Sequence, residues 1–65
     1  MKNKNKNRKV LILDAVEKGD CENGTFYRFY WEDKNGRYYD DDIRYFGYTK
    51  EEAKNRSKQH ILESL

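Results

Sequence analysis

Apolar and polar side chains alternate along this chain in a way that predicts three strands followed by a helix. Residues 10–16 begin with four aliphatic side chains, and residues 25–31 hold five aromatic side chains in seven positions. Short alternating runs of β-branched and aromatic residues are typical of strands. Residues 38–48 form a third such run, with three adjacent aspartates in its middle. Because like charges repel, we expect a bulge or a wider loop there, with residues 43–48 the better-formed half.

Turn-forming residues separate these segments. Lys18-Gly19-Asp20 and Glu22-Asn23-Gly24 predict that a loop of about six to eight residues joins the first two strands. Asn35-Gly36 tolerates the positive φ angles of a tight reversal, which predicts the turn between the second and third strands.

The last quarter of the chain predicts a helix. Thr49-Lys50-Glu51-Glu52 has the form of a capping box, in which the threonine hydroxyl and the glutamate each bond the other's backbone N–H. Without Gly or Pro to end it, the helix should run to about Glu63. Its thin apolar stripe consists of Ala53, Ser57, Ile61 and Leu65, helped by His60 and Leu62. The predicted fold class is therefore α+β, a three-stranded antiparallel sheet packed on one C-terminal helix (β-β-β-α), with residues 10–65 as a single domain.

In a strand, successive side chains point to opposite faces, which places Tyr27, Phe29 and Trp31 on one side of the sheet. The other side then carries Phe26, Arg28 and Tyr30. One helix covers only one face, so we expect the second, aromatic face to stay open and to dock a macromolecule.

Positive charge is concentrated at the start of the chain. Residues 1–9 contain no acid and five of the fourteen positive side chains, so nine positive and twelve negative side chains remain for residues 10–65. A polar, charged segment of this kind predicts a flexible basic arm, which either attracts phosphate backbones or only increases solubility. The five positive residues are Lys2, Lys4, Lys6, Arg8 and Lys9.

Several classes of function are disfavoured by composition. Cys21 and His60 are the only residues of their kinds, so we expect no disulfide, no metal centre and no catalytic pair. With no glycine-rich phosphate loop either, an enzyme is the least expected class, and we expect no cofactor and no small-molecule substrate. The longest apolar run is far short of the ~20 residues that span a bilayer. We therefore expect a cytoplasmic protein without a membrane partner.

Part of the chain resembles a known family. Tyr27-Arg28-Phe29-Tyr30, the turn at residues 33–37, Phe46 and the helix start at residues 49–53 resemble the β-β-β-α arm-binding domains at the amino terminus of phage-integrase-type tyrosine recombinases. The same residues resemble, less closely, the apetala-type plant DNA-binding domains. The resemblance covers about half the chain and implies that the open sheet face lies in the DNA major groove. The residues that it implies in contact with bases or phosphates are Arg28, Tyr30, Arg37 and Arg44.

Three hypotheses of function follow. The first is a small DNA-binding protein that uses the open face and the basic arm. The second is a protein-interaction module, or an inhibitor encoded by a phage or mobile element, whose open face and acidic residues Asp40, Asp41 and Asp42 engage a basic site on a host protein. The third is a homodimer that buries this face against itself. The aspartates are also candidates to pair with Arg28 or Arg44 across the strands, or to form a solvated acidic loop.

Overall fold

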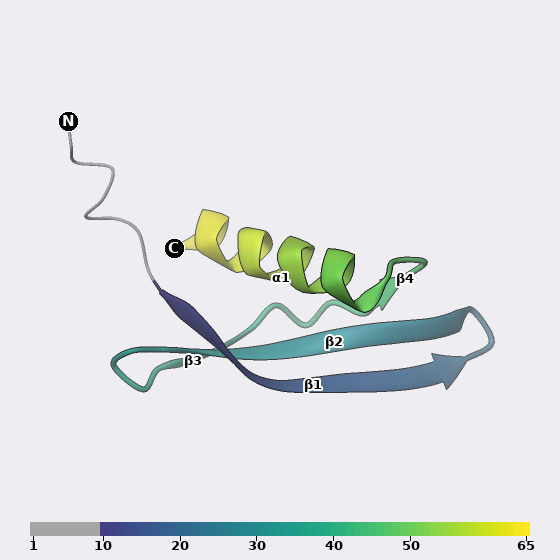
Figure 1. Cartoon of the computed structure of the whole chain (residues 1–65), viewed down its shortest axis with the longest axis horizontal. Helices are drawn as coiled ribbons and strands as arrows, with labels where there is room; N and C mark the ends of the chain where they lie inside the picture. The colour runs from purple at the N-terminus through teal and green to yellow at the C-terminus, as the bar shows by residue number, and fades with distance from the viewer. Residues whose placement is uncertain (1–9) are drawn as a thin grey trace.

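The computed structural model describes residues 10–65, and residues 1–9, where the basic arm is predicted, lie outside the described residues. The fold is α+β, as predicted: an antiparallel sheet followed by a single C-terminal helix (Figure 1). The elements in chain order are β1 (Leu11–Cys21), β2 (Gly24–Asp33), β3 (Tyr38–Asp40), β4 (Tyr45–Phe46) and α1 (Lys50–Ser64).

The aromatic strand β2 is the centre of the sheet. It pairs with β1 along one side, and with β3 and then β4 along the other. The predicted third strand is thus interrupted at the aspartates, as expected. The expectation that residues 43–48 are its better-formed half is wrong, because β4 has two residues and β3 has three.

The β1–β2 hairpin is longer and tighter than the turn residues predicted. β1 runs to Cys21, which pairs with Gly24 across a loop of only Glu22 and Asn23. The predicted long loop is wrong because Gly19 is a strand residue. It lies opposite Phe26, and a Cβ at Gly19 would stand 2.5 Å from the tip of the Phe26 ring. Glycine here makes room for a ring and does not turn the chain.

A bulge changes the alternation of side chains in β1. Leu13 pairs with Trp31 and Ala15 with the preceding residue of β2, Tyr30, so Asp14 is an extra residue in the ladder. As a result, Leu13 before the bulge and Val16 after it both pair with residues of the same face.

The start of the helix is fixed by the predicted capping box. The Thr49 hydroxyl accepts a hydrogen bond from the Glu52 backbone N–H at 3.2 Å, and the Glu52 carboxylate accepts one from the Thr49 N–H at 3.0 Å. The second bond stabilises the ionised carboxylate and lowers the pKa of Glu52.

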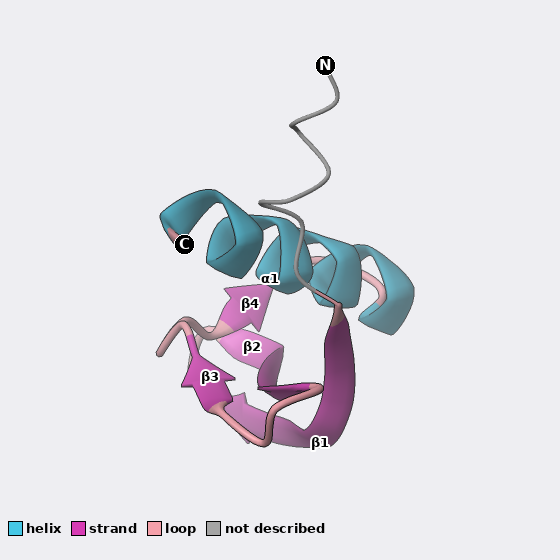
Figure 2. Ribbon diagram, turned by 90° about the vertical axis from the view of Figure 1, so that its left-hand side faces the viewer, coloured by secondary structure: helices cyan, strands magenta, loops and turns pink. Residues whose placement is uncertain are grey.

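The core lies between α1 and one face of the sheet, and the helix crosses only that face (Figure 2). Ala53 and Ser57 are fully buried, since their small side chains let the helix approach the aromatic strand closely. The indole N–H of Trp31 donates a hydrogen bond to the Ser57 hydroxyl at 2.9 Å. The stripe ends one turn earlier than predicted, because Leu65 is 52% exposed. The buried apolar cluster consists of Leu11, Phe29, Trp31, Tyr45, Ala53 and Ile61.

Candidate functional site

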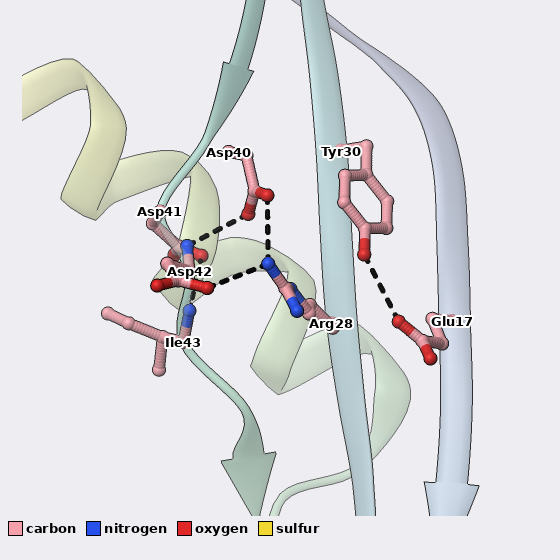
Figure 3. A network of polar contacts seen from close by, with 7 residues as sticks. All are labelled: Glu17, Arg28, Tyr30, Asp40, Asp41, Asp42 and Ile43. Atoms are coloured by element: carbon pink, nitrogen blue, oxygen red, sulfur yellow. Dashed lines mark hydrogen bonds and ion pairs between the residues drawn. The ribbon is translucent and has the colours of Figure 1, made fainter.

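The open face is the surface of the sheet turned away from α1, and Figure 3 looks onto it with the helix behind the strands. Its residues follow from the alternation along β2 and from the strand pairing. They are Ile12, Ala15, Glu17 and Gly19 of β1, Phe26, Arg28, Tyr30 and Glu32 of β2, Tyr38 and Asp40 of β3, and Phe46 of β4.

The aromatic rings of β2 are largely covered on this face, so the expectation that they form an open aromatic surface is wrong, although Tyr38 of β3 is 66% exposed there. Phe26 is only 8% exposed, and Tyr30 is half-buried. The ring of Phe46 packs on Phe26 with 5.4 Å between centroids, and the Arg44 guanidinium lies 5.4 Å from the centroid of the same ring. The chain covers these rings itself, with side chains that come from the β3–β4 segment.

Arg28 stands at the centre of the open face and is held by two carboxylates. Its Nη2 atom bonds Asp40 at 2.9 Å and Asp42 at 2.8 Å (Figure 3). Its guanidinium also lies 5.4 Å from the centroid of the Tyr30 ring, and the side chain is 19% exposed. The hydrogen bond to Asp40 is the largest cause of the raised pKa of Arg28, although partial desolvation acts in the opposite direction. The predicted cross-strand pairing of Arg28 with the aspartates is confirmed.

The three aspartates form an ordered turn between β3 and β4. The Asp42 N–H donates to the Asp40 carboxylate at 2.8 Å, and the Ile43 N–H donates to the Asp41 carboxylate at 3.2 Å. Asp41 also accepts a hydrogen bond from the Tyr45 hydroxyl, and Asp42 has a φ of 58°. Aspartate tolerates this left-handed conformation better than most residues. The acidic run therefore breaks the strand and also brings two carboxylates to Arg28.

Tyr30 connects the centre of the open face to β1. Its hydroxyl donates to the Glu17 carboxylate at 3.1 Å (Figure 3). Desolvation, and then this bond, raise the pKa of Tyr30. The phenol therefore stays protonated and keeps Glu17 close to the sheet.

Within residues 10–65, carboxylates outnumber cations on and around the open face. Arg28 and Arg44 are the positive side chains of this part of the chain that reach it, whereas Glu17, Glu32, Asp40 and Asp42 are negative. Glu17 and Glu32 were not predicted as site residues. Glu17 was missed because the residues after it resembled a turn, which ended the predicted strand too early. The one signal for a longer β1 is that Gly19 can stand opposite a large aromatic residue of β2.

Of the other predicted site residues that the structure describes, Arg37 and Arg44 lie away from this centre. Arg37 is exposed in the β2–β3 turn, where its backbone exchanges hydrogen bonds with Asp33. Arg44 is exposed and lies over Phe26. The arm residues Lys2, Lys4, Lys6, Arg8 and Lys9 lie outside the described residues.

A groove of about 390 Å³ lies beside the aspartates, between β3 and the end of α1. Asp40 and Asp41 line it together with Tyr39, His60 and Ile61. Carboxylates and apolar atoms thus share one concave surface, a combination that suits the aliphatic stem and charged head of a Lys or Arg side chain.

Neither a metal cluster nor a helix that could span a membrane is found in residues 10–65. No group of three or more His, Cys, Asp or Glu side chains in this part of the chain is arranged to hold a metal ion. The helix α1 is too short and too polar to cross a bilayer.

Comparison with known proteins finds no matching family model, no matching curated protein and no matching solved structure. The resemblance to recombinase and apetala-type domains stays a prediction, and the function has to be argued from the surface itself.

Proposed function

We propose that this protein is a non-enzymatic protein-binding module whose open face engages a basic surface of another protein. The observation that carries this proposal is the double engagement of Arg28 by Asp40 and Asp42. Two carboxylates outweigh the single positive charge of Arg28, the Asp42 side chain remains 85% exposed, and the half-buried Glu32 adds a further negative charge to the face. The groove beside Asp41 adds a concave site for a cationic side chain.

Electrostatic complementarity favours a cationic partner over a phosphate backbone on this face. Opposite surface potentials steer association and exclude partners of like charge. A duplex laid on the open face would place phosphates near Glu17, Glu32 and Asp42, and binding would require Arg28 to leave both of its carboxylates.

The test measures the affinity of a partner, identified from lysate by cross-linking and then purified, for matched variants of the full chain. Glu32→Gln with Asp42→Asn removes two open-face charges and keeps side-chain shape, and asparagine tolerates the backbone of Asp42. We expect affinity by calorimetry to fall roughly tenfold or more. Glu51→Gln with Glu63→Gln removes the same charge from exposed positions on the helix and should bind like the wild type. Equal affinities of the two double variants would contradict the proposal.

DNA binding is the second candidate, supported by the five positive side chains of residues 1–9 and by the exposed Arg37 and Arg44. It requires that affinity for duplex DNA fall steeply with added salt and weaken when residues 1–9 are deleted. Fluorescence anisotropy with a labelled duplex measures both effects. The protein-binding proposal expects no binding of duplex even at low salt.

Two narrower predictions remain alongside these candidates. A homodimer through the open face would bring two negative surfaces together, which repulsion disfavours, and sedimentation at increasing concentration tests it. That the module is an inhibitor encoded by a phage or mobile element stays a prediction.

A further inference from the structure

The outer edge of β1 is an unpaired sheet edge. β1 pairs with β2 along one side, and no other strand among residues 10–65 pairs with its second side. From Ala15 to Cys21 the pairing with β2 runs without a shift, so the outer edge of this stretch is regular. Such an edge presents backbone N–H and C=O groups to any extended chain laid beside it.

Aliphatic side chains next to this edge are exposed on both sides of the sheet. Ala15, on the open face, is exposed, and Val16, on the side that carries the helix, is 37% exposed. Val16 remains exposed because α1 packs mainly over β2, and of β1 only Leu11 is buried. An added strand alternates its side chains between the two faces, and it would therefore cover apolar surface on both.

Charges along β1 decide what kind of strand fits. Asp14, Glu17 and Asp20 are exposed acids, and Lys18 is the one basic side chain of this strand. A second copy of β1 would bring the same excess of negative charge, and its own bulge at Asp14 would interrupt the pairing. A basic segment instead places opposite charges across the new strand pair.

We propose that an extended partner segment, in which Lys or Arg alternates with aliphatic residues, adds as a strand to the outer edge of β1. This inference rests on the proposed function, because it specifies how a basic partner attaches. The strand would lie beside Glu17 at the margin of the open face, so one partner contacts both surfaces.

The test uses the full-length chain labelled with ¹⁵N and a synthetic peptide in which lysine alternates with valine. We expect the amide resonances of residues 15–21 to shift on titration and their hydrogen exchange to slow. A peptide in which glutamate replaces lysine should bind at least roughly tenfold more weakly, because its carboxylates would lie beside Glu17 on the open face. A lysine peptide with proline at its centre should also lose affinity, since proline removes a backbone donor.

Matched variants of the chain locate the contact. Val16→Lys adds a charge at the edge and should weaken binding of the lysine peptide roughly tenfold. Asn55→Lys adds the same charge at an exposed residue of α1, away from this edge and from the open face, and should leave binding unchanged. Absence of peptide binding, equal binding of the glutamate peptide, or shifts confined to α1 or β3 would overturn the inference.

The two proposals fail separately. If the purified partner binds Val16→Lys as tightly as wild type but not the Glu32→Gln and Asp42→Asn variant, only the edge inference is wrong. If the lysine peptide adds to β1 while that double variant binds the partner normally, only the open-face proposal is wrong.

Discussion

Ser57 shows how one small residue can connect two elements. It lies fully buried under the helix and accepts the indole N–H of Trp31 at 2.9 Å. Ser57→Ala would leave this N–H without its acceptor in a dry site, at a cost of about 1–3 kcal/mol in the free energy of unfolding. Urea denaturation measures the loss. Ser64→Ala is the control, because the Ser64 hydroxyl is exposed and its removal should change stability by less than ~0.5 kcal/mol.

Gly19 and Phe26 form a second pair whose coupling can be measured. A methyl group at Gly19 would overlap the tip of the Phe26 ring, so Gly19→Ala should displace the ring and cost about 1 kcal/mol. With Phe26→Ala already in place, the same change should be neutral or stabilising, since alanine suits a strand better than glycine. A double-mutant cycle by chemical denaturation measures the difference. Additive effects of the two changes would show that the ring does not depend on the glycine.

At the level of elements, the capping box of α1 makes stability depend on pH. The Thr49 N–H holds the pKa of Glu52 below its unfolded value, so Glu52 stabilises the fold above the unfolded pKa of about 4.3. This contribution is lost as the pH falls through that value toward the lower, folded pKa. Thermal unfolding followed by circular dichroism should therefore show Glu52→Gln less stable than wild type near neutral pH, with the difference shrinking in acid.

Glu51→Gln is the matched control for this prediction. It removes a carboxylate from the same helical turn without a partner in the cap. A pH dependence identical to that of Glu52→Gln would mean that the first-turn charge, and not the reciprocal hydrogen bond, is responsible.

Elements whose signals are local were predicted well. Thr49 and Glu52 lie three residues apart, so the sequence already contains both halves of the cap, and the helix begins where predicted. β1 was predicted too short because Gly19 resembles a turn residue in the sequence. Its contact with the Phe26 ring on the neighbouring strand exists only in the folded chain. The split of the third strand followed from the repulsion of adjacent aspartates, whereas the lengths of its two halves depend on pairing with β2.

The candidate surface was predicted only in part, because some of its contacts can be inferred from the sequence and others form only in the fold. The pairing of Arg28 with aspartates could be foreseen because opposite charges stood on strands expected to be neighbours. The burial of Phe26 could not, because its cover comes from Arg44 and Phe46, which reach it only after the chain has turned twice.

At the scale of the whole molecule, one helix and one twisted sheet make a single core, with the helix on one side of the sheet (Figure 1). Within residues 10–65, the second side of the sheet carries an ion-paired centre in place of a second layer. The fold class follows from the order of the elements and was predicted. The charge and exposure of the uncovered side were not predicted, because they depend on which charged side chains the fold brings together. Ion pairs and rings stacked under arginines hide aromatic surface that would otherwise require a partner.

The extra residue in β1 also affects which changes of length the chain tolerates. Leu13 and Ala15 already oppose neighbouring residues of β2. A chain without Asp14 therefore keeps all the pairs between β1 and β2, and each side chain stays on its present face of the sheet. A residue removed anywhere between Ala15 and Cys21 would instead have to be absorbed by straightening the kink at Asp14, which shifts the intervening side chains by one place. The bulge is therefore the natural point at which homologous chains could differ by a single deletion.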